Sequence, residues 1–345
     1  MHLKTRKARK EEILKTIINL YIEHGEPVSS RAVSQLSSIS LSPASIRSLM
    51  AELEDMEFLY QPHASSGRIP TDKGYRMYVD MLQDTCELSD LEKVTLRDHI
   101  GIEMGLDDLI DHAVEMLSLK SSCTGIALSS GLHDAKLHFV QFLRLTSCRI
   151  LGLFIADDGR VFKRTLQTDE DYSEDELSRI TNLINRDFPH YSLYEICNTL
   201  KDSLNEERMN YRTLLNHALK LSAILSLELS PMQNLWIKGA SNLFNNLDFS
   251  TVEKMKIVMN ALEEKTRLVE LLSQCLANRD INVKIGAECQ FNELSDFSII
   301  TSSYGKDNRS LGLLGVIGSK RMRYDHIIPL VDFTAELLTC KLSME

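Results

Sequence analysis

The residues best suited to contact an anion lie in the segment LYQPHASSGRIPTDKGYRMYVD, residues 59–80. This segment carries Arg68, Lys73 and Arg76, although the whole chain of 345 residues has a formal net charge of -10. The prolines and the glycine of its first half limit the backbone to a rigid turn. A rigid turn that presents arginine is typical of a loop that lies against a nucleic-acid backbone.

His63 beside Ser65 and Ser66 also suits nucleophilic chemistry. However, no Gly-x-Ser-x-Gly elbow surrounds these residues, and no orienting carboxylate can be assigned to them. The chain has no P-loop and no Gly-x-Gly-x-x-Gly after a strand. We therefore predict that the protein is not an enzyme and has no catalytic residues and no cofactor.

Cysteine and histidine usage predicts neither disulfides nor a metal site. The seven cysteines are scattered, without a Cys-x-x-Cys pair, which suits a reducing cytoplasm. The nearest approach to a ligand cluster is His133 and His138 around Asp134, and their five-residue spacing is not that of a metal-binding motif. We expect no metal-binding residues.

No segment predicts export or a membrane span. The first thirty residues lack the continuous apolar stretch of a signal peptide. The longest apolar runs, at 150–156 and 311–318, are far shorter than the roughly 18 to 20 residues that cross a bilayer, and they are typical of buried strands. We expect a cytoplasmic protein with no membrane partner.

Three amphipathic helices are predicted at the beginning of the chain. Residues 10–24 repeat apolar side chains at helical spacing, and Gly25 then favours a left-handed helix end. A short second helix through RAVSQL can be capped by Ser29 or Ser30. Ser42 is a good N-cap for a third helix, and the proline after it suits the first helical position.

The third helix and the segment after it predict a winged helix-turn-helix. FLYQP and RIPT can pair as a hairpin around HASSG, and a hairpin in this place is a wing. Arg47 can donate to a guanine edge or a phosphate, and Arg68 would meet the DNA backbone, whereas Tyr75 and Tyr78 are expected in the core. The predicted DNA-contacting residues are Ser42, Ala44, Ser45, Arg47, Ser48, His63, Ser65, Ser66, Arg68 and Lys73.

The charge is unevenly distributed. Residues 1–80 hold 11 Lys and Arg against 10 Asp and Glu, and residues 81–345 hold 28 against 39. The first ten residues contain five unopposed cations, either an arm that lies along phosphates or a solvated terminus. The acidic balance therefore belongs to the later part of the chain.

These motifs resemble those of the HrcA family of heat-inducible transcription repressors. The segments that carry the resemblance are GEPVSSRAVSQ, LSPASIRSLMAELEDMEFLYQPHASSGRIPTDKGYRMYVD, SIITSSYG and LGLLGVIGSKRMRYDHIIPLVDF, which follow one another in the family's order. The resemblance implies a homodimeric repressor that binds double-stranded DNA at an inverted-repeat operator of groE and dnaK type chaperone operons. It also implies that activity depends on the GroE chaperonin.

The sequence departs from the family pattern at three places. Ser45 and Ser48 stand where the family commonly has threonine and asparagine, and residues 62–68 read PHASSGR where the family has PHTSAGR. A serine at 48 lacks the amide that can pair with adenine, so the operator preference differs if this position reads a base. Residues 318–324 read GSKRMRY where the family has GPTRMDY, a change that we assign to structure.

The rest of the chain predicts a multidomain α+β protein, with strands on both sides of a largely helical stretch and an Asp158–Gly159 turn between two of them. The resemblance implies a GAF-like αβ domain with an inserted, mainly helical dimerisation domain. The expected boundaries are 1–82 for the winged helix, 83–120 for a helical linker, 121–191 with 279–345 for the GAF-like domain, and 192–278 for the insert.

Two other functions remain open from the sequence. The protein can be a winged-helix transcription factor whose GAF-like domain senses a small ligand, which requires a polar-lined cavity in the sheet domain. It can also be a chaperonin-binding or scaffold protein, which would show no DNA sequence preference.

Overall fold

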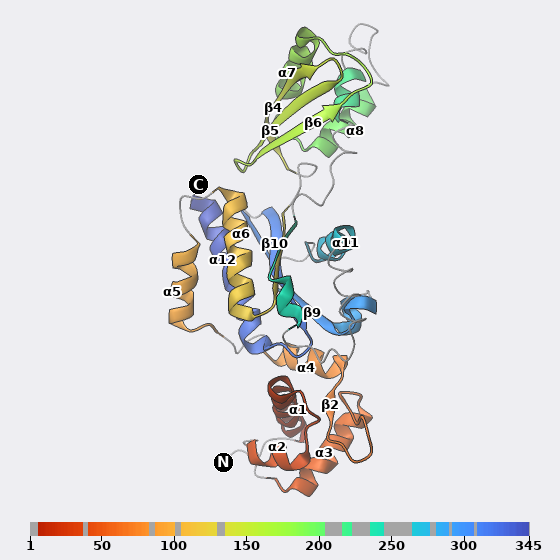
Figure 1. Cartoon of the computed structure of the whole chain (residues 1–345), viewed down its shortest axis with the longest axis vertical. Helices are drawn as coiled ribbons and strands as arrows, with labels where there is room; N and C mark the ends of the chain where they lie inside the picture. The colour runs from red at the N-terminus through yellow and green to blue at the C-terminus, as the bar shows by residue number, and fades with distance from the viewer. Residues whose placement is uncertain are drawn as a thin grey trace. The chain divides into compact units, whose positions relative to one another are not determined.

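The computed structural model (Figure 1) is described for residues 6–36, 41–82, 87–100, 105–129, 135–203, 216–222, 235–244, 264–276, 281–289, 292–306 and 309–344. The chain forms two compact units. Unit 1 comprises Met1–Ala127, Trp236–Gly305 and Leu313–Glu345, and unit 2 comprises Leu128–Leu235 and Lys306–Gly312.

Unit 1 begins with helices and a short hairpin in the predicted order. The elements are α1 (Arg6–His24), α2 (Ser30–Leu36), α3 (Pro43–Asp55), β1 (Leu59–Tyr60), β2 (Ile69–Pro70) and α4 (Asp72–Leu82). β1 and β2 pair antiparallel, with Leu59 opposite Pro70. Gly25 ends α1 with a φ of 75°, a left-handed conformation that glycine adopts without steric cost. The three predicted helices and the hairpin are confirmed.

The core of this part comes from the helical periodicity of α1 and α3. The two helices pack together through their buried aliphatic faces. The residues buried on these faces are Ile13, Leu14, Ile17 and Ile18 of α1 and Ile46, Leu49, Met50 and Leu53 of α3. Tyr75 and Tyr78 of α4 are also buried, as predicted, and both rings lie near Tyr324.

A five-stranded sheet has the order β7-β3-β10-β9-β8. Its strands are β3 (Thr124–Ser129), β7 (Leu235–Lys238), β8 (Asn282–Ile285), β9 (Phe297–Lys306) and β10 (Arg309–Ser319). The accompanying helices are α5 (Asp90–His99), α6 (Leu106–Ser121), α11 (Lys265–Leu276) and α12 (Tyr324–Met344), with short 3-10 turns η2 (Ala240–Phe244), η3 (Gly286–Cys289) and η4 (Asn292–Leu294). α6 packs along α12, as Figure 1 shows.

Unit 2 contains a three-stranded antiparallel sheet in the order β4-β5-β6. Its elements are β4 (Leu137–Thr146), β5 (Arg149–Ala156), β6 (Val161–Gln167), α7 (Glu174–Asp187) and α8 (Leu193–Ser203). α7 packs against β4, and its buried face shares one apolar core with the inner face of the sheet. The predicted Asp158–Gly159 turn is confirmed, because β5 pairs antiparallel with β6 and Gly159 has a φ of 84°.

The strands group differently from the expected boundaries. The expected boundaries place 121–191 with 279–345 in one αβ domain, whereas β4, β5 and β6 pair only with one another among the described strands. The expected linker also differs, because α5 and α6 both contact α12. The reason is physical, since periodicity identifies a strand or a helix but not its partner. Much of the expected insert at 192–278 lies outside the described residues.

Within the part of the chain that the structure describes, no helix is both long enough and apolar enough to cross a bilayer.

Candidate nucleic-acid interface

The start of α3 is fixed by its cap. Ser42 has extended backbone, and its Oγ accepts a hydrogen bond from the Ser45 N–H at 3.2 Å. The two serine Oγ atoms are also 3.0 Å apart, within hydrogen-bond distance. Pro43 occupies the first helical turn, where its missing N–H leaves no bond unmade. The cap therefore holds the helix start without help from another element.

The residues that follow the cap form a small exposed surface. Ala44, Ser45, Arg47 and Ser48 are exposed, whereas Ile46 between them is buried in the core. The Arg47 side chain has no hydrogen bond or ion pair with any other described residue. Its guanidinium is therefore available to a ligand, and the short neighbours leave room for a groove edge to approach.

The turn between β1 and β2 is closed by its own polar groups. The Ser66 hydroxyl donates to the His63 carbonyl at 2.7 Å, and the His63 N–H donates to Ser66 Oγ at 3.0 Å. Gln61 Nε2 donates to the carbonyls of Ala64 and Ser66, each at 2.9 Å. Ser66 therefore shapes the turn, while the side chains of His63 and Ser65 are left exposed.

The second half of the hairpin is attached to the connection between α1 and α2. Val28 and Arg68 exchange two backbone hydrogen bonds, each 2.9 Å long. A Cβ on Gly67 would overlap the carbonyl oxygen of Val28. Glycine is therefore required at 67 by this close backbone approach.

Arg68 lies at the base of the hairpin and not at its tip. Its Nε donates to Glu54 Oε2 at 2.8 Å, and the side chains of Arg68 and Glu54 are 17% and 34% exposed. The ion pair joins the hairpin to the last turn of α3. The two terminal nitrogens of the guanidinium make no hydrogen bond to any described residue, so the pair orients Arg68 and leaves donors for a phosphate.

The other two cations of the segment 59–80 are also paired. Lys73 Nζ lies 3.1 Å from Glu57 Oε2 and 5.4 Å from the centroid of the Phe58 ring. Arg76 Nε donates to Glu288 Oε1 at 2.9 Å, and this hydrogen bond raises the pKa of Arg76. Arg76 thus belongs to the contact of α4 with η3, and Lys73 remains more than half exposed.

The basic arm meets a carboxylate that sequence reasoning missed. Arg6 and Lys10 of α1 both contact Glu52 of α3, with Lys10 Nζ 2.8 Å from Glu52 Oε2. The hydrogen bonds from Lys10 and then Arg6 lower the pKa of Glu52. The sequence offers little signal for this pairing, because Glu11 and Glu12 are nearer to the arm along the chain and only the packing of α1 against α3 brings Glu52 to it. Lys4 lies outside the described residues.

The predicted interface residues thus fall into two groups. The start of α3 and the exposed turn residues are free to meet a ligand, whereas Arg68 and Lys73 are held by Glu54 and Glu57. An exposed helix start beside a hairpin suits a major groove and the adjacent phosphates.

Comparisons with known proteins show the family of the chain. The sequence model of the HrcA protein C-terminal domain matches residues 107–328. The heat-inducible transcription repressor HrcA of Geobacter sulfurreducens is 37% identical over 333 residues, covering 96% of each chain. That of Methylobacillus flagellatus is 34% identical over 336 residues, covering 97% of this chain and 98% of the relative.

A solved crystal structure, titled only as a hypothetical protein, has a TM-score of 0.63 and 22% sequence identity over 99% of both chains. It shares the fold with this chain. The matched relatives are transcription repressors, which confirms the prediction that the protein is not an enzyme. The chain belongs to the HrcA family of heat-inducible transcription repressors.

Proposed function

We propose that the protein represses groE and dnaK type chaperone operons by binding an inverted-repeat operator as a homodimer. The observation that carries the proposal is the exposed start of α3, where Arg47 has no partner among the described residues and the neighbouring side chains are short. In this proposal α1, α2, α3 and the β1–β2 hairpin act as a winged helix-turn-helix. The recognition helix is α3 and the wing is the hairpin.

The DNA contacts are divided between the two elements. Ala44, Arg47 and Ser48 meet base edges or the phosphates beside them, and Ser42 and Ser45 act mainly through the cap. On the wing, the contacts come from His63, Ser65, Arg68 and Lys73, while Ser66 holds the turn. Phosphate contacts of this kind position the protein, and base contacts specify the sequence.

The outer face of the sheet in unit 2 supports the homodimer. This face carries several apolar side chains although α7 covers only the opposite one, and the exposed ones lie on β4 and β6. They are Phe139, Leu143 and Leu145 of β4 and Val161 of β6, with half-buried Leu151, Leu153 and Ile155 of β5. A second copy would cover this face, and a symmetric operator needs two copies.

In the proposed arrangement unit 2 serves as the dimerisation insert. The five-stranded sheet with α6 and α12 would be the GAF-like αβ domain. This assignment takes 128–235 as the insert in place of 192–278, because β4, β5 and β6 pair with one another. The protein would act in the cytoplasm.

Dependence on GroE follows from the family resemblance and is consistent with the apolar sheet face. A chain that has not yet dimerised exposes that face, and exposed apolar surface makes incompletely assembled proteins prone to aggregate. A chaperonin would keep such chains competent to dimerise. Adding GroE to freshly refolded protein should then raise operator occupancy.

A competition gel shift tests the repressor function. An inverted-repeat operator should be bound at least about a thousandfold more tightly than scrambled DNA of the same length. Equal binding of both DNAs would instead favour the scaffold function. Light scattering of Leu143→Asp should show monomers, while Arg179→Glu should stay dimeric because Arg179 is exposed on α7, which covers the opposite face of the sheet.

A cavity in unit 1 would suit a second function, the binding of a small ligand. It measures about 680 Å³ and lies where the end of α1, the end of α6 and the beginning of α12 come together. Its polar lining includes Asn19, Glu23, Lys120, Asn242 and His326. A small effector bound there would make the protein a ligand-sensing transcription factor.

The two functions respond differently to purified components. Pure protein that binds the operator fully without GroE, and releases it when a small polar metabolite is added, would favour the sensor. Operator binding that does not respond to such a metabolite and rises when GroE is added would favour the chaperonin-dependent repressor.

A further inference from the structure

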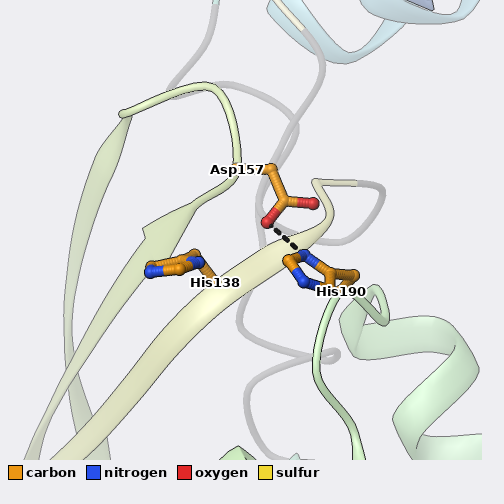
Figure 2. A group of neighbouring side chains, drawn as sticks. All are labelled: His138, Asp157 and His190. Carbon is orange, nitrogen blue, oxygen red and sulfur yellow. Dashed lines mark hydrogen bonds and ion pairs between the residues drawn. The ribbon is translucent and has the colours of Figure 1, made fainter.

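Three side chains with metal-binding atoms meet in unit 2, away from the residues proposed to contact DNA. His138 lies in β4, Asp157 follows β5, and His190 lies between α7 and α8. One nitrogen or oxygen from each of them lies within 4.8 Å of those of the other two. Figure 2 shows the two imidazole rings below the Asp157 carboxylate, and all three side chains are exposed.

Backbone hydrogen bonds hold the three ligands at the beginning of β4. The His190 N–H donates to the Leu137 carbonyl at 3.0 Å, and the Leu137 N–H donates to the Tyr191 carbonyl at 3.0 Å. The Asp157 N–H donates to the Lys136 carbonyl at 2.9 Å. The backbone at each of the three residues is therefore held beside the beginning of β4 by the fold.

The turn that carries Asp157 is held by hydrogen bonds from a buried arginine. Arg160, which is only 8% exposed, donates through Nε to Asp158 Oδ2 at 2.8 Å and through Nη1 to Ser129 Oγ at 2.9 Å. The neighbouring carboxylate, Asp158, is thus occupied by this arginine. Asp157 is the carboxylate of the turn that faces the imidazoles (Figure 2).

The segment that carries His190 is braced in a similar way. Glu195 accepts the Ser192 N–H at 2.8 Å and also binds Lys136 Nζ at 2.8 and 2.6 Å through its two oxygens. This joins the start of α8 to the residue before β4. The histidine and the strand consequently move together.

His190 itself has an unusual backbone. Its φ of 63° lies in the left-handed region, which is sterically unfavourable for a non-glycine residue. The conformation turns the ring toward Asp157, and Nδ1 lies 2.7 Å from Asp157 Oδ1. The His138 and His190 ring centroids are 6.1 Å apart. An outlier of this kind is a reason to ask what the side chain does.

The donor set selects a class of metal. Imidazole nitrogens suit zinc, copper, nickel and iron, whereas magnesium and calcium prefer oxygen ligands alone. Two ligands of tetrahedral zinc are roughly 3.3 Å apart, given bonds of about 2.0 Å. An ion that replaces the hydrogen between His190 and Asp157 therefore requires them to separate by about half an ångström.

We infer that His138, Asp157 and His190 bind a divalent transition metal such as zinc. The ion cross-links β4, the turn after β5 and the segment before α8. Because all three side chains are exposed, its remaining coordination positions are open to water or to a further ligand. This inference does not depend on operator binding. The sequence predicted no metal site because two of the ligands are far from His138 along the chain.

Zinc titration of the full chain by calorimetry tests the inference. The background carries Cys148→Ser and Cys340→Ser, which removes the thiols that are exposed among the described cysteines. His138→Gln, Asp157→Asn and His190→Asn should each weaken zinc binding at least about tenfold. Asparagine is chosen at 190 because it tolerates the left-handed backbone.

His217→Gln is the matched control. His217 lies in the same unit with Nε2 3.8 Å from Glu170, and among the described residues it is not part of a group of side chains that could hold a metal ion. Zinc affinity should be unchanged in this variant. Circular dichroism of each metal-free variant checks that the fold is kept.

Cobalt supplies an independent readout of the ligands. Cobalt added to the same background should give visible ligand-field bands without a thiolate charge-transfer band, and each of the three ligand variants should lose them. The inference is overturned if the background binds zinc no more tightly than the three variants, or if the cobalt spectrum shows thiolate ligation.

Discussion

The start of α3 and the β1–β2 hairpin present their arginines in opposite ways. Arg47 stands on an exposed helical turn with no partner among the described residues, while Arg68 is mostly buried and donates to Glu54 at 2.8 Å. The cap of Ser42 orders the first element from within, and the second is ordered by bonds to Val28 and Glu54. The first element thus leaves its arginine side chain unpaired among the described residues, and the second holds its arginine against Glu54.

This difference separates two kinds of contribution to binding. An arginine without a protein partner can exchange its bound water for a hydrogen bond to a base edge, and so distinguish one DNA sequence from another. An arginine already paired with a carboxylate supplies orientation, and its added affinity for phosphate is reduced by the charge it already meets. Four substitutions test the contrast, from the largest expected effect to the smallest.

Gly67→Ala should break the anchor of the hairpin. The added methyl overlaps the Val28 carbonyl, so the hairpin and the α1–α2 connection must move apart. The free energy of unfolding should fall by about 1–3 kcal/mol, and operator affinity should fall with it. Urea unfolding measures the first quantity and gel shift the second. Ala64→Ser, in the same turn and exposed, is the control; equal loss in both variants would remove the special role of residue 67.

Arg47→Ala should leave the fold intact and reduce discrimination. The gap between operator and random DNA should narrow by about 1–3 kcal/mol, because a bidentate contact to guanine is lost. Gel shifts on both DNAs across a salt series give the measurement. If the variant keeps its full preference, Arg47 contacts only the backbone, and the sequence is read by Ser48 or by the wing.

Arg68→Ala should weaken operator and random DNA alike and also cost stability. The lost phosphate contact flattens the log-log salt slope by about one unit. The partly buried pair with Glu54 adds about 1 kcal/mol to stability, between the values for exposed and buried pairs. A double-mutant cycle with Glu54→Ala isolates that coupling. A steady salt slope in Arg68→Ala would show that the arginine serves only the hairpin.

Glu52→Gln should strengthen binding to any DNA by a few-fold at low salt, because it releases Arg6 and Lys10. The pKa of the Glu52 carboxyl is lowered from its ordinary value of 4.5. The carboxylate is therefore ionised and paired at neutral pH, and its ion pairs are lost as the pH falls through the lowered pKa. The variant and the parent should therefore converge in acid. Asp98→Asn, an exposed change on α5, is the control and should bind as the parent does.

Local features were predictable from the sequence, and long-range pairings were not. The Ser42 cap, the Gly25 helix end and the burial of Tyr75 and Tyr78 follow from residue type and spacing within a few positions. The Arg68–Glu54 pair joins residues 14 positions apart, and no periodicity specifies the direction of an arginine side chain.

The same limit explains the larger differences. The sequence shows that 137–146, 149–156 and 161–167 are strands, yet it does not show that they form a sheet apart from β8, β9 and β10. The meeting of His138, Asp157 and His190 depends on that sheet and on the return of the chain after α7. Such contacts are set only when the whole unit packs.

The carboxylates at 52, 54 and 57 have a consequence for the time that an operator search takes. Each of them already neutralises a cation that would otherwise grip any phosphate. A repressor must find its operator among on the order of 10⁶ or more competing sites. Weak affinity for the non-specific sites shortens the time that the protein stays bound at each of them. More molecules then remain free to sample other sites. The acidic second half of α3 and the turn after it would thus lower the affinity of the protein for non-specific DNA and shorten the time that it needs to find its operator.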